Sequence, residues 1–214
     1  MDAQSRLPQH LMETTMRLPV HTLLATALAL GASAASAHPQ TYVGTLSNAG
    51  EPAQAAGSLG TGMVKLTLNE DDFSLKVEVS FSNLSGLSTN SHIHCCTADA
   101  GTGSAGVATP LPTFVGFPSG VASGSYLQTF DMSLDSSWNP AFITANGGTA
   151  GSAFAVFATG LAAGKAYLNI HSTLSPGGEI RAFTTLAPVP EPESYALMLA
   201  GLGALALVAR RRNG

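Results

Sequence analysis

Residues 64–81 read VKLTLNEDDFSLKVEVSF, and the alternation of apolar and polar side chains in this stretch decides the fold class. Every second residue is apolar in residues 64–68 and again in residues 75–81, with a polar turn at residues 69–72 between the two segments. A period of two is typical of strands that bury one face. The stretch therefore predicts an antiparallel hairpin with one buried and one solvated face.

The same strand signals recur along the body of the chain and indicate a mainly β domain. Further strands are predicted at residues 42–46, 88–94, 126–134, 165–172 and 178–186. The exception is the segment 137–163, where a short helix can begin near Pro140 and where Thr149–Leu161 is an Ala- and Phe-rich helical stretch. Seven short strands favour an antiparallel sandwich or barrel, with a short helical insertion before the last hairpin.

The first 37 residues have the pattern of a secretory signal peptide. Residues 18–30 are mostly apolar, and the small tripeptide ending at Ala37 fits a cleavage site for signal peptidase. The mature chain would then begin at His38. The residues before Met16 include two acidic side chains, which is unusual for a leader that should be positively charged, so we expect Met16 to be the true start.

The last segment, residues 189–214, combines a short Pro-rich box, an apolar run and a basic end. The box is Pro190-Glu191-Pro192, the apolar run is Ser194–Ala209, and three arginines follow. A helix over this run spans about 24 Å, short of the ~30 Å hydrocarbon core unless it tilts or its ends snorkel. The arginines favour the cytoplasmic side of a membrane, which would place the body of the protein outside.

This tail resembles the PEP-CTERM sorting signal of Gram-negative bacteria. The resemblance implies that an exosortase recognises the box and removes the anchor, whereas the alternative is a plain C-terminal anchor without processing. In either case both ends predict an exported protein. Its precursor would be held transiently in the inner membrane by a transmembrane helix, before release to the periplasm, the cell surface or the extracellular matrix.

The body between the two ends, residues 38–188, is long enough for one domain with its own core. It carries four Lys and Arg residues against nine Asp and Glu residues, a net charge of −5. No basic stripe is present for nucleic acid, so nucleic acid is excluded as a partner.

Three histidines of the body are candidate metal ligands. In a strand, His92 and His94 project to one face and Ile93 to the other, while His171 is opposed in the same way to Ile170. If the isoleucines face the core, all three imidazoles face outward, and two adjacent strands would bring them together as ligands of one copper or zinc ion. The competing interpretation is three exposed histidines without a ligand role.

Cys95 and Cys96 are the only cysteines of the chain, and they are neighbours in the sequence. In an oxidising compartment they can form a vicinal disulfide directly after the His-x-His strand. Two alternatives remain open: free thiols that supplement the histidines and favour Cu(I), and a disulfide between two chains.

Several motifs of the body together resemble the CHRD domain, first described in chordin. They are Ser91-His92-Ile93-His94, the loop ending Gly103-Ser104-Ala105-Gly106, and the stretch 166–172 leading to Pro176-Gly177-Gly178-Glu179-Ile180-Arg181. The resemblance covers most of residues 40–183 and implies an immunoglobulin-like sandwich or barrel with a distant likeness to copper/zinc superoxide dismutase. The molecular function of that family is not established.

The likeness to the dismutase would place copper on His92, His94 and His171. The zinc half is absent, because no histidine lies between His94 and His171. Arg181 is a candidate for an anion-guiding arginine, with a surface salt bridge as the alternative.

Two functions follow from these patterns. The first is a non-catalytic binding or matrix component at the cell surface, with an extracellular protein or polysaccharide as its partner and no catalytic residues. The alternative is a copper-binding or copper-dependent redox protein that uses the three histidines.

Overall fold

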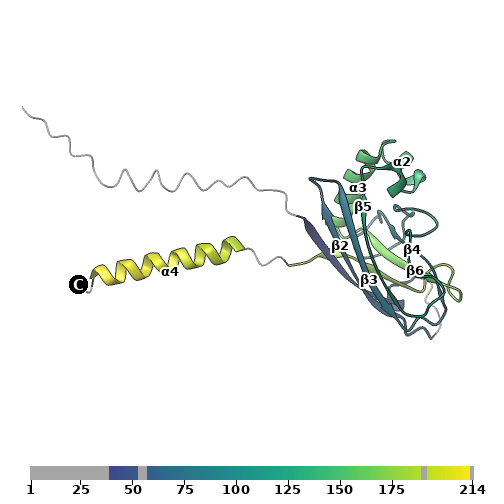
Figure 1. Cartoon of the computed structure of the whole chain (residues 1–214), viewed down its shortest axis with the longest axis horizontal. Helices are drawn as coiled ribbons and strands as arrows, with labels where there is room; N and C mark the ends of the chain where they lie inside the picture. The colour runs from purple at the N-terminus through teal and green to yellow at the C-terminus, as the bar shows by residue number, and fades with distance from the viewer. Residues whose placement is uncertain (1–38, 53–56, 189–191, 213–214) are drawn as a thin grey trace, which may run out of the picture. The chain divides into compact units, whose positions relative to one another are not determined.

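The computed structural model describes residues 39–52, 57–188 and 192–212 (Figure 1). The predicted signal peptide, its cleavage site and the alternative start lie outside the described residues. So do Pro190 and Glu191 of the sorting box.

The described chain is mainly β. Its elements in chain order are β1 (Gln40–Ser47), the 3-10 helix η1 (Asn48–Gly50), β2 (Thr61–Asn69), β3 (Ser74–Ser82), β4 (Ser88–His94), β5 (Gly124–Asp131), the 3-10 helix η2 (Asp135–Ser137), α2 (Pro140–Ala145), α3 (Ala150–Ala162), β6 (Tyr167–Ser172), β7 (Ile180–Phe183), β8 (Thr185–Leu186) and α4 (Pro192–Arg212). Every predicted strand is present, and α2 and α3 form the predicted helical insertion before the last hairpin.

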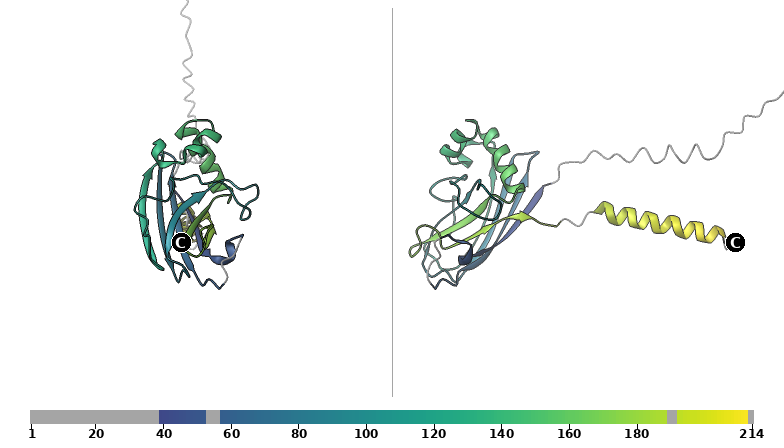
Figure 2. Two further views of the ribbon diagram at one scale, coloured as in Figure 1. Left: turned by 90° about the vertical axis from the view of Figure 1, so that its right-hand side faces the viewer. Right: turned by 180° about the vertical axis from the view of Figure 1, so that it is seen from behind.

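All strands belong to one antiparallel sheet that curls into a half-barrel (Figures 1 and 2). The strand order is β4-β6-β7-β1-β2-β3-β5, and β8 pairs with β1. In the described part of the chain the edge strands β4 and β5 do not pair with each other. Among the described strands the structure shows one curled sheet rather than two facing sheets or a closed barrel, and the immunoglobulin- or dismutase-like arrangement stays a prediction. Side chains of α2 and α3, rather than those of a second sheet, complete the core.

The predicted hairpin is present as β2 and β3, which lie between β1 and the edge strand β5 in this sheet. Val64 pairs with Val79, and both side chains are buried in the core. On the opposite face Lys65 pairs with Glu78, with 2.8 Å between the ammonium nitrogen and a carboxylate oxygen. The sequence alternation is thus reproduced as one buried and one solvated face.

The two helices begin at capping residues that the sequence supplies. Asn139 accepts a hydrogen bond from the N–H of Ala141 before Pro140 starts α2, and Thr149 forms a capping box with Ser152 before α3. The buried indole of Trp138 packs against rings of both helices. This aromatic contact joins α2 and α3 to the core of the sheet.

The two ends of the domain lie side by side. Tyr42 of β1 is paired with Leu186 of β8, and the N–H of Ala187 donates to the carbonyl of Thr41 at 2.7 Å. The strand that closes the domain is therefore hydrogen-bonded to the strand that opens it.

The C-terminal helix α4 carries the three arginines in its last turn. Within the described residues, no helix combines the length and the apolar character needed to cross a membrane. The transmembrane anchor over Ser194–Ala209 stays a prediction.

Candidate metal centre

The three histidines come from the paired strands β4 and β6. His92 lies opposite Asn169, and His171 follows Asn169 by two residues on the same face of the strand. Ile93, between His92 and His94, is fully buried in the core. The alternation predicted from the sequence is therefore present.

The imidazole rings converge. The Nε2 atoms of His92 and His171 are 3.0 Å apart, and the ring centroids of His92 and His94 are separated by 4.8 Å. One ligand nitrogen from each ring lies within 4.8 Å of the other two. Such a group of three could hold a metal ion.

A backbone carbonyl orients each ring through Nδ1. The distance from Nδ1 to the carbonyl oxygen is 3.3 Å for His92 and Pro112, 2.7 Å for His94 and Ala105, and 2.7 Å for His171 and Pro176. A carbonyl oxygen only accepts, so Nδ1 carries the proton and Nε2 keeps its lone pair. Contacts of this kind set the tautomer and the orientation of histidines that bind metals.

The short contact between His92 and His171 fits two ligands of one ion. With both Nδ1 atoms protonated, two Nε2 lone pairs face each other at 3.0 Å, which is repulsive unless a proton or a cation lies between them. A tetrahedral ion about 2.0–2.1 Å from each nitrogen sets the two nitrogens about 3.3 Å apart.

The three imidazoles are held in the neutral form that binds metals. Burial lowers the pKa of His94 and of His171, although each has a backbone hydrogen bond that raises it. For His92, burial and the neighbouring charges of His94 and His171 lower the pKa to about 3, against a smaller opposing effect of the Pro112 carbonyl. A metal ion would therefore not have to displace protons from these rings at neutral pH.

The expected exposure of the histidines is wrong for this site. His92 is only 5% exposed, and His94 and His171 are partly buried. The carbonyls of Ala105 and Pro112 belong to the segment between β4 and β5, which lies over the outward face of these strands. The group is thus shielded on a face that strand parity alone would leave to solvent.

A buried polar network adjoins the histidines. Asn169 is registered opposite both His92 and Arg181, and its side-chain N–H donates to the carboxylate of Glu51. Its Oδ1 is buried and has no hydrogen-bond partner among the described residues. Burial raises the pKa of Glu51 to about 7, although Arg181 and Asn169 lower it.

Arg181 has a structural place in this network. Its guanidinium is buried, donates to the carbonyls of Gly50 and Gly103, and lies 4.7 Å from the ring centroid of Tyr167. The predicted roles as an anion guide or as a surface salt-bridge partner are not supported by this placement.

Glu179 is a second buried carboxylate that residue patterns did not single out. It accepts hydrogen bonds from Ser58 and from the backbone N–H groups of Ser85 and Gly86. Burial by itself raises the pKa of Glu179, but these hydrogen bonds and one from Ser172 bring it below its usual range. Both Asn169 and Glu179 lie in quoted motifs, whereas no sequence signal marked Glu51.

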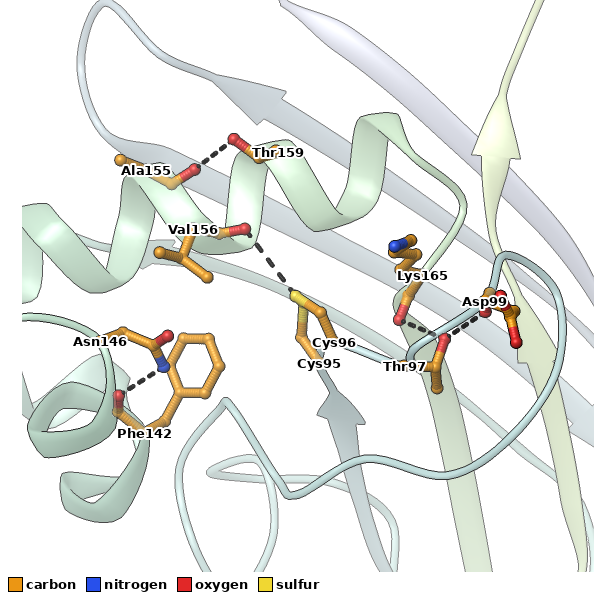
Figure 3. Close-up of a disulfide and its surroundings, with 10 residues drawn as sticks. All are labelled: Cys95, Cys96, Thr97, Asp99, Phe142, Asn146, Ala155, Val156, Thr159 and Lys165. Carbon is orange, nitrogen blue, oxygen red and sulfur yellow. Dashed lines mark hydrogen bonds between the residues drawn. A yellow bond between two sulfur atoms is a disulfide. The ribbon is translucent and has the colours of Figure 1, made fainter.

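The cysteines lie apart from the imidazoles. Cys95 and Cys96 are joined by a disulfide that packs against α3 near Val156 (Figure 3). Neither sulfur belongs to the group of converging ligand atoms. Thiol ligation alongside the histidines has no support in this arrangement.

Comparison with known families matches both the body and the tail. The CHRD domain matches residues 42–183, and the PEP-CTERM protein-sorting motif matches residues 188–212. No curated protein and no solved structure matches the chain. Both predicted resemblances are confirmed, and the first match contains the three histidines and the disulfide.

Proposed function

The chain belongs to the CHRD domain family, and we propose that it is an exported protein that binds a copper ion through the Nε2 atoms of His92, His94 and His171. The convergence of three neutral imidazoles, each oriented by a backbone carbonyl, carries this proposal. Imidazole suits both copper and zinc, and a site of this kind generally binds Cu²⁺ more tightly than Zn²⁺.

The buried amide of Asn169 supports a fourth ligand from solvent. Its free Oδ1 requires a donor, and a water molecule bound to the ion could supply one.

The sorting motif supports export and processing by exosortase. We propose that signal peptidase cuts before His38, that exosortase removes the tail near Pro190-Glu191-Pro192, and that the product remains at the cell surface or in the extracellular matrix. An extracellular protein or polysaccharide remains the proposed partner. Mass spectrometry of the exported product tests the processing, because a product that retains α4 would contradict it.

A role in holding metal is better supported than dismutase chemistry. The described residues contain one group of converging ligands, so the zinc half of a dismutase has no counterpart there. The fixed guanidinium of Arg181 is also committed to two carbonyls.

Metal titration with matched variants tests the proposal. We expect one copper ion per chain and a loss of affinity of at least about tenfold for His92→Ala and for His171→Ala. Asn90→Ala, on the same strand as His92, is the matched control and should bind as the wild type does. His38→Ala controls for copper at the predicted mature N-terminus. Equal affinity in all of these variants would refute a site built on the three imidazoles.

A further inference from the structure

The disulfide rests directly on the backbone of α3. A side chain at Gly160 would overlap the sulfur atoms of both Cys95 and Cys96, so the helix accepts the pair only because this residue has no Cβ. The end of β4 is thereby held against α3 by the close contact between the disulfide and Gly160, which we call the disulfide seat.

The two sulfurs differ in access. Cys95 is 5% exposed and belongs to the core, whereas Cys96 is partly exposed. In Figure 3, Val156 of α3 lies on one side of Cys96, and Thr97 and Lys165 lie on the other. A pocket of about 380 Å³, lined by Cys96, Val156, Gly160 and Lys165 but not by Cys95, lies on this side. Another pocket, of about 350 Å³, is lined by both cysteines, so the difference in access rests on the low exposure of Cys95 and on the pocket that Cys96 lines without it.

The disulfide seat is linked to the metal centre by the backbone between His94 and Cys95. His94 directly precedes Cys95, and both are held by one loop. Nδ1 of His94 donates to the carbonyl of Ala105, and the N–H of Cys95 donates to the carbonyl of Gly106 at 3.1 Å. A shift of the cysteines therefore moves the backbone that positions a metal ligand.

We propose that the Cys95–Cys96 disulfide is a redox site, opened at Cys96 by a dithiol reductant, whose state sets the affinity of the histidine centre for metal. This inference rests on the proposed metal binding. In the first step a thiolate of the reductant attacks the Cys96 sulfur, a mixed disulfide forms, and Cys95 leaves as a thiolate that takes up a proton. The second thiol of the reductant then releases Cys96, so the reductant is oxidised to a disulfide and the protein gains two thiols.

Reduction loosens the seat because non-bonded sulfurs need more room. Bonded sulfurs are about 2.05 Å apart, whereas non-bonded heavy atoms approach to about 3.5–4 Å. The backbone of α3 at Gly160 leaves no space on that side, so the sulfurs can separate only by moving away from Gly160, toward the pocket beside Cys96. Cys96 or the helix must move, and the alignment of His94 with the other two rings is lost.

The test compares three forms of the full chain: oxidised wild type, wild type reduced with dithiothreitol and freed of reagent under anaerobic conditions, and Cys95→Ala/Cys96→Ala. Each is titrated with Zn²⁺, which cannot reoxidise thiols. We expect the reduced form to bind Zn²⁺ about tenfold more weakly than the oxidised form, as when a residue that supports a metal ligand is lost. The dialanine form has no sulfurs to separate and should bind Zn²⁺ as the oxidised form does. Reduced His92→Ala controls for zinc held by the new thiols.

Affinities within twofold across the three forms would overturn the coupling while leaving the metal site intact. If no form binds Zn²⁺ or copper, the proposed function itself fails. The exchange step has its own readout: brief reaction with glutathione and acid quenching should place the glutathionyl group on Cys96, and a group found on Cys95 contradicts the proposed order of attack. Should the dialanine variant not fold, the reduced wild type still decides.

Discussion

Replacing Gly160 by alanine should have opposite effects with and without the disulfide. In a helix, Gly→Ala gains about 1 kcal/mol of intrinsic stability. In the oxidised protein the new methyl group overlaps two sulfurs that cannot move independently, and overpacking of this kind costs about 3 kcal/mol. We expect Gly160→Ala to lower the free energy of unfolding by about 2 kcal/mol in the wild type.

The Cys95→Ala/Cys96→Ala background removes the overlap. The nearest remaining atom to the new methyl group would be the Cβ of residue 96, at 3.4 Å. There Gly160→Ala should raise the free energy of unfolding by about 1 kcal/mol, which gives a coupling energy of about 3 kcal/mol in the double-mutant cycle.

Urea unfolding monitored by tryptophan fluorescence measures all four proteins. Trp138 is the only tryptophan of the chain, it is buried, and its indole N–H donates to the carbonyl of Met132 at 2.9 Å. The m-values should agree, so that midpoints report stability alone. A change of the same sign and size in both backgrounds would refute the contact between the sulfurs and Gly160.

Two further predictions concern the polar network. The folded-state pKa of Glu51, about 7, lies above its ordinary value of 4.5, so this group destabilises the fold increasingly as pH rises from about 4.5 to 7. The change in the free energy of unfolding caused by Glu51→Gln should therefore be about 3 kcal/mol more stabilising at pH 8 than at pH 4. Urea unfolding of the variant and of the wild type at each pH measures this change, and a change that does not depend on pH contradicts the assignment. Arg181→Lys should lower the free energy of unfolding by about 2 kcal/mol in the same measurement, because lysine cannot bridge two carbonyls and stack on Tyr167 at once. A decrease below about 0.5 kcal/mol would show that the guanidinium is dispensable.

Strands β2 and β3 could be predicted because each buries one face, and burial of one face gives the sequence a period of two. Residues 64–68 and 75–81 appear as the paired strands β2 and β3, and Thr149 was correctly placed at the start of a helix. What the alternation does not encode is the layer that covers a face. A sandwich or a barrel was predicted, whereas in the structure α2 and α3 contribute apolar side chains to the core of one curled sheet.

The sequence predicted the three histidines of the candidate site, but it did not predict the residues that cover and surround them. Strand parity places His92 and His94 on one face, but the segment that shields them has no period, and its carbonyls at Ala105 and Pro112 act through the backbone rather than through residue type. The buried carboxylate of Glu51 follows a 3-10 helix far from the motifs, so no local pattern ties it to Asn169.

The pairing of β1 with β8 has a consequence for how this domain combines with other segments. Because Tyr42 and Leu186 are partners, the polypeptide enters and leaves the sheet at one point. A domain whose two ends are adjacent can be inserted into a surface loop of another protein, or repeated in series, while the two ends of the host loop stay close together. Segments attached before β1 or after β8 can therefore be exchanged while the strands between them stay unchanged.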